Sequence, residues 1–157
     1  MSQPSKKRFE VRPYAVGIVV IHLALNVAHG IAHSQLGIGL DLFQEVFVGV
    51  VVFAAPLFAG YWLWKNRLRE GGLLLAVSMA GAFAFGVYFH FIHPGPDNVS
   101  FTNPGASPRA RELFEYTSMD LAISEALGVL LGLAAFIRSF APAHTAATRD
   151  PRGQNSA

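Results

Sequence analysis

Cysteine is absent from this sequence of 157 residues, and charged residues are scarce. Without thiols the chain can form neither a disulfide nor an iron–sulfur cluster, and any metal site must use histidine, carboxylate, amide or backbone ligands. Only 14% of the residues are charged, against about 25% in an average soluble domain. The formal net charge is +2, while 52% of the residues are hydrophobic. This composition argues against a disordered chain, a nucleic-acid-binding protein and a disulfide-stabilised secreted domain.

Long apolar runs make up most of the chain. A helix needs about 20 predominantly apolar residues to cross a bilayer, and four segments reach that length: 14–36, 42–64, 72–93 and 117–140. Each helix of a soluble bundle needs a polar face, yet the whole run from Val46 to Leu63 contains no charged residue. We therefore predict an all-α fold, an integral membrane four-helix bundle that resides in the cell membrane as a multi-pass protein.

Lysine and arginine residues indicate the orientation, because cytoplasmic loops of membrane proteins carry an excess of them. They gather before the first segment, between the second and the third, and after the fourth. These regions lie on one side if all four segments span, so we expect both termini in the cytoplasm. The predicted organisation is a basic cytoplasmic tail (1–13), a membrane domain (14–140) with an irregular outer loop (94–116), and a disordered cytoplasmic tail (141–157).

Histidines inside the apolar segments are functional candidates, because ionisable groups are costly in a bilayer. At about 100° per residue, His22, Asn26, His29 and His33 fall on one stripe of the first segment. His29 and His33 are four residues apart, so both imidazoles can reach one ion. In the third segment His90 and His93 are three residues apart and share a face.

All four segments place such groups near the same, non-cytoplasmic end, since Glu45 lies near the start of the second and Glu125 near the start of the fourth. Imidazole and carboxylate without thiolate suit zinc, iron, manganese or oxidised copper. We predict a divalent metal site with ligands drawn from six residues: His29, His33, Glu45, His90, His93 and Glu125. His22, close to mid-membrane, is assigned a structural hydrogen bond instead.

The sequence leaves the activity open between several classes. A metal with an open position could serve a hydrolase or an oxidoreductase that acts on a lipid or small substrate. Two histidines such as His29 and His90 could instead ligate haem b for electron transfer. A chain of acids and histidines could translocate protons or metal ions, and a carboxylate–histidine pair could act as acid and base without metal.

A structural interpretation is also open, in which the same residues form an interhelical hydrogen-bond network. The expected partners are the lipid bilayer, a lipid or small-molecule ligand and further copies of the chain in a homo-oligomer, with no nucleic acid.

Overall fold

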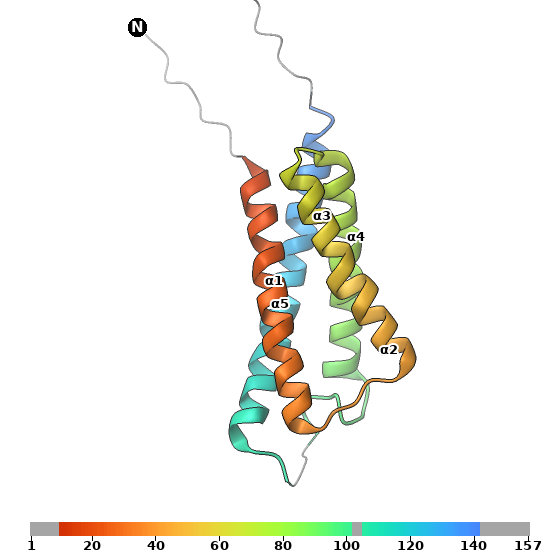
Figure 1. Ribbon diagram of the computed structural model, residues 1–157, viewed down its shortest axis with the longest axis vertical. Coiled ribbons are helices and arrows are strands. Elements are labelled where there is room, and N and C mark those ends of the chain that lie inside the picture. Colours follow the sequence, from red (N-terminus) through yellow and green to blue (C-terminus); the bar gives the residue numbers. More distant parts are fainter. Residues whose placement is uncertain (1–9, 102–104, 142–157) are drawn as a thin grey trace, which may run out of the picture.

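The computed structural model describes residues 10–101 and 105–141, and within these ranges the chain forms helices and turns with no strand (Figure 1). Four spans are long and apolar enough to cross a membrane, as the apolar runs predict. The first is α1 and the fourth is α5, whereas the second and third each contain a π-helical stretch. In chain order the elements are α1 (Val11–Leu36), α2 (Leu42–Phe47), η1 (Val48–Ala54), α3 (Ala55–Trp64), α4 (Leu68–Val87), η2 (Tyr88–Ile92) and α5 (Pro108–Arg138).

Helix α5 begins nine residues before the predicted start at 117. The Ser107 side chain accepts a hydrogen bond from the Ala110 amide at 3.1 Å, and Pro108 occupies the first turn, where its missing N–H has no cost. Residues 108–116, the last part of the predicted outer loop 94–116, are therefore helical, because capping signals override their polar composition.

The first and third spans also start earlier than their apolar runs, whereas the second starts at Leu42 and ends at Trp64 as predicted. Helix α1 includes Pro13, which is tolerated because the first N–H groups of a helix lack intrahelical partners. Both ends of the described chain lie at the same end of the bundle (Figure 1). The predicted tails fall largely on residues 1–9 and 142–157, outside the described residues.

Small residues bring the helices into close contact in the half of the bundle that contains these ends, which we call the packed half. A methyl group on Gly132 would lie 2.6 Å from the Ala76 nitrogen, and one on Gly72 would lie 2.6 Å from the Phe136 nitrogen, so α4 and α5 touch through their backbones. The core that fills this half comprises Val11, Ala15, Ile18, Val19, Ala59, Leu63, Leu75, Met79 and Ala135.

The second span leaves the bundle in the other half, which we call the open half. Helix α3 packs against α1 and α4, whereas α2 leans away from α1 (Figure 1). Helix α2 starts with a capping box, in which the Asp41 carboxylate accepts from the Gln44 amide at 2.8 Å and the Gln44 side chain accepts from the Asp41 amide at 2.9 Å. The divergence leaves a cavity among α1, η1, α4 and α5.

Candidate metal centre

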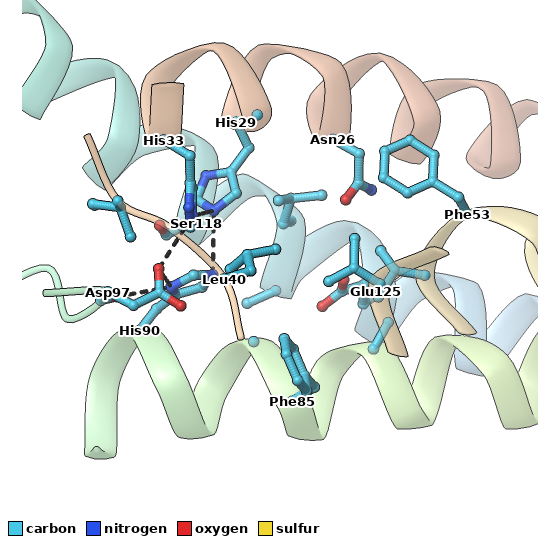
Figure 2. Close-up of a pocket in the computed structure, with 18 of the residues that line it drawn as sticks. Asn26, His29, His33, Leu40, Phe53, Phe85, His90, Asp97, Ser118 and Glu125 are labelled. Atoms are coloured by element: carbon cyan, nitrogen blue, oxygen red, sulfur yellow. Dashed lines mark hydrogen bonds and ion pairs between the residues drawn. The ribbon is translucent and has the colours of Figure 1, made fainter. Parts of the chain in front are cut away.

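Three imidazole rings from α1 and η2 meet in the open half (Figure 2). The Nε2 atom of His29 lies 3.0 Å from Nε2 of His33 and 3.2 Å from Nε2 of His90. One ring nitrogen from each residue lies within 4.8 Å of the other two. Nitrogens bound about 2.0–2.1 Å from a tetrahedral zinc ion are about 3.3 Å apart, so two of the three spacings are close to those of a metal-bound set.

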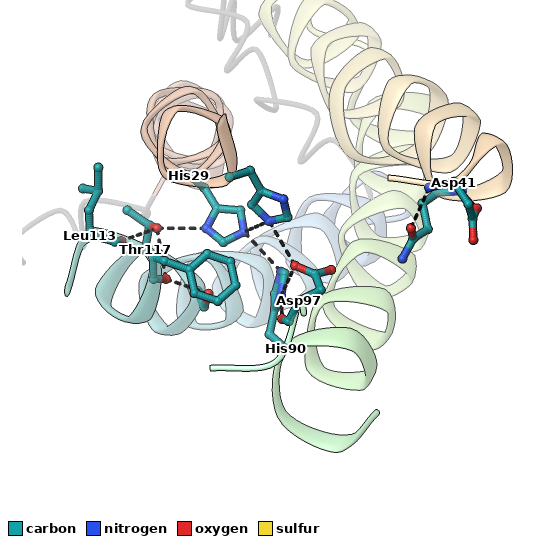
Figure 3. Close-up of polar contacts among 10 residues, drawn as sticks. His29, Asp41, His90, Asp97, Leu113 and Thr117 are labelled. Atoms are coloured by element: carbon teal, nitrogen blue, oxygen red, sulfur yellow. Dashed lines mark hydrogen bonds and ion pairs between the residues drawn. The ribbon is translucent and has the colours of Figure 1, made fainter. Parts of the chain in front are cut away.

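Thr117 on α5 fixes the orientation of the His29 ring. The Thr117 hydroxyl donates to the Leu113 carbonyl at 2.6 Å, so its oxygen is left to accept from Nδ1–H of His29 at 2.9 Å (Figure 3). With the proton on Nδ1, a neutral His29 presents a lone pair at Nε2. This is the arrangement that orients a metal-binding histidine from its second nitrogen.

The loop after η2 fixes the His90 ring in the same way. Its Nδ1–H donates to the backbone carbonyl of Asp97 at 2.9 Å, and a carbonyl can only accept. A neutral His90 therefore also presents a lone pair at Nε2. The contact of 3.2 Å between His29 and His90 thus joins two acceptors, and a cation between them would remove their repulsion.

Asp97 adds a carboxylate to this cluster. Its Oδ1 lies 3.1 Å from Nε2 of His33 and 3.2 Å from Nδ1 of His90, at ion-pair distance but without hydrogen-bond alignment. Burial acts to raise the pKa of Asp97, but the contacts with His33 and His90 outweigh burial and hold that pKa below its usual range. The Asp97 side chain is 13% exposed, so its carboxylate can offset part of the charge of a bound cation.

Glu45 and His93, two of the predicted ligands, lie outside this cluster. Both side chains are exposed. A π-helix closes its hydrogen bonds over one residue more than an α-helix, so η1 changes the helical phase between Glu45 and the buried Val52. His93 precedes Pro94, takes an extended conformation and stacks on Tyr88 at 5.4 Å.

Glu125, a further predicted ligand, lies in the cavity beside the three imidazoles but deeper in the bundle (Figure 2). Its Oε1 is 3.9 Å from Nδ1 of His22. His22 donates from Nε2 to the Val52 carbonyl at 3.1 Å and so links α1 to η1, while the Asn26 amide donates to the His22 carbonyl at 2.9 Å. Glu125 thus forms a second polar centre in the cavity.

Asp97 and Thr117 were not among the residues predicted from the sequence. The segment His93-Pro94-Gly95-Pro96 carries a signal for Asp97, because such a turn can fold the chain back onto the helix it has just left. The Val99 amide donates to the His90 carbonyl at 3.0 Å, which closes this turn. No sequence pattern singles out Thr117, whose role depends on how α5 packs against α1.

The space between His29 and His90 is too small for haem b, the alternative cofactor. The rings of His29 and His90 have centroids 4.8 Å apart at 71° and touch directly, so a macrocycle does not fit between them.

In comparisons with known proteins, no family model, curated protein or solved structure matches this chain.

Proposed function

We propose that this protein is an integral membrane metalloprotein that binds a divalent ion through His29, His33 and His90. The site lies near the extracytoplasmic face, and both termini are cytoplasmic. The four apolar spans support membrane insertion, and the lysine and arginine distribution supports the orientation.

The observation that carries this proposal is the contact between Nε2 of His29 and Nε2 of His90. In a hydrogen-bond network each contact needs one proton. When both rings are neutral, Thr117 and the Asp97 carbonyl hold their protons at Nδ1, which leaves none for the space between the rings. A divalent cation satisfies both lone pairs, and Nε2 of His33 supplies a third ligand atom.

The chain's own residues position the site and adjust its charge. Thr117 and the Asp97 backbone hold two rings, and the Asp97 carboxylate reduces the net charge of the centre. Three protein ligands leave a position for water or a substrate, at which a bound ion would act as a Lewis acid or a redox centre. A metal-dependent hydrolase or oxidoreductase is therefore the enzyme class that we favour.

Translocation of protons or metal ions receives less support. A path across the membrane would have to continue through the packed half, where the side chains of Leu63, Leu75 and Met79 are fully buried in an apolar core.

The experiment that tests the proposal is elemental analysis with a visible spectrum, on protein purified in detergent without chelator. We expect one ion per chain and no Soret band. His29→Ala and His90→Ala should each lower metal occupancy more than tenfold, because either change removes a ligand and leaves its partner ring unpaired. His93→Ala is the matched control, since His93 lies on the same segment as His90 but is exposed.

Circular dichroism on the same samples separates loss of metal from loss of fold. Folded wild-type protein without metal after incubation with zinc, copper, iron and manganese would contradict the proposal. So would equal losses in His93→Ala and His90→Ala.

A further inference from the structure

The cavity beside the three imidazoles has a volume of about 370 Å³, within the range of about 300–1,000 Å³ found for small-molecule sites. Its apolar lining includes Val48, Val52, Phe53 and Phe85 from the second and third spans. Polar groups in the lining come from α1 and α5 and include Asn26, Ser118 and Glu125 (Figure 2). The lining thus combines apolar and polar side chains.

Glu125 is a buried acid in this cavity with one oxygen that no described residue hydrogen-bonds. Its side chain is 5% exposed and its Oε2 atom has no hydrogen bond within the described part of the chain. The nearest ionisable group, Nδ1 of His22, is 3.9 Å from the other oxygen, too far for a hydrogen bond. Leaving such an atom buried and unpaired is unfavourable, so a ligand group that hydrogen-bonds to it would be stabilised.

Gly86 lies near both Glu125 and His90. A methyl group at Gly86 would lie 3.7 Å from Oε2 of Glu125 and 3.8 Å from Cδ2 of His90. One small functional group above Gly86 can therefore contact Glu125 on one side and the His90 ring on the other.

Gly30 on α1 and Val48 on η1 both line the cavity. We place its mouth between these two elements, because the second span diverges from α1 in the open half (Figure 1). Exposed side chains beside Gly30 in the sequence of α1 are apolar and include Val27 and Ile31. These residues belong to the spans that we place in the bilayer, so the mouth opens toward hydrocarbon.

We propose that the cavity takes a single-chain neutral amphiphile from the bilayer. Its hydroxyl or carbonyl group lies above Gly86 between Glu125 and His90, and its hydrocarbon chain runs along Val52 and Phe53 and leaves between α1 and η1. The inference rests on the proposed function for membrane insertion, and it names the substrate class that the metal centre would meet.

The test uses photocrosslinking of the full-length protein in detergent. The probe is a long-chain primary alcohol with a diazirine near its hydroxyl end, and the matching alkane without the hydroxyl is the comparison. We expect saturable labelling of peptides that contain Phe53 or Phe85, and about tenfold weaker labelling by the alkane, as loss of one hydrogen bond to a buried acid predicts.

Two pairs of variants locate the probe. Val48→Trp should close the mouth and reduce labelling about tenfold, whereas Val50→Trp, on the same π-helix but outside the cavity, should leave it within about twofold. Glu125→Leu should weaken labelling by the alcohol about tenfold, while Glu125→Gln, which keeps an acceptor at the same place, should change it less.

Metal content measured on the same samples separates the two proposals. Metal at full occupancy with labelling that is unsaturable, or equal in Val48→Trp and Val50→Trp, would overturn the ligand assignment and leave the metal centre standing. Specific labelling of protein without metal would overturn the metal centre and support the cavity assignment.

Discussion

The packed half and the open half of this bundle are built from similar apolar helices, but they differ in how those helices pack. In the packed half, Gly72 and Gly132 bring α4 and α5 into backbone contact, and a cluster of buried apolar side chains fills the core. In the open half the second span diverges, a cavity replaces close packing, and buried polar side chains line it. Because lipid chains are as apolar as leucine, close packing rather than hydrophobicity holds membrane helices together. We therefore expect the packed half to contribute most of the stability. We expect the open half, with its cavity and polar side chains, to carry the chemistry.

Gly132→Ala should produce the largest effect in stability and should leave the metal centre intact. The added methyl would lie 2.6 Å from the Ala76 nitrogen, so α4 and α5 must separate, at a cost of about 2–3 kcal/mol. The measurement is the free energy of unfolding in mixed micelles, followed by circular dichroism. Gly17→Ala is the control, because nothing lies within 4 Å of its added methyl.

Equal unfolding free energies for these two alanine variants would contradict the assignment of stability mainly to the packed half. Loss of metal from the folded Gly132→Ala protein would do so as well, because the site would then depend on packing at the opposite end.

Thr117→Val should affect the open half alone. The substitution keeps the shape of the side chain but removes the oxygen that accepts from Nδ1–H of His29. Loss of such a partner lowers metal affinity by about 10–100-fold, which a titration against a chromophoric chelator can measure. Ser118→Ala, a neighbouring buried hydroxyl that donates to the Phe114 carbonyl, should leave the metal affinity within about twofold; an equal loss there would remove the special role of Thr117.

Glu45→Gln should have the smallest effect on both halves. Glu45 is exposed in the first turn of α2, and substitutions at such positions usually change stability by less than about 0.5 kcal/mol. Metal occupancy should equal that of wild-type protein by elemental analysis. A clear loss of metal would mean that α2 swings toward the histidines in the metal-bound state.

The sequence predicts the helices well because a bilayer-length apolar run has few alternatives to a helix. It also predicts the pairing of His29 and His33, since both lie on one regular helix and their spacing fixes their common face. Those features depend on local periodicity, which can be read along a single segment.

The positions of the other candidate residues depend on irregular backbone and on tertiary packing, which helical periodicity cannot predict. The π-helical stretches change the phase of the second and third spans, so a shared face predicted from 100° per residue fails for Glu45 and for His93. Asp97 reaches the site through a turn rather than a helix face. Glu125 was expected among the ligands, but only the tertiary structure places it next to His22.

The all-nitrogen face formed by His29, His33 and His90 has a consequence for which ion the proposed site would hold. Nitrogen donors bind divalent ions in a fixed order, with copper above zinc and both above iron and manganese, and nothing in three imidazoles reverses it. The ion recovered from cells will therefore reflect the supply of each metal in the compartment where the chain folds, and growth in media of controlled metal content will change it.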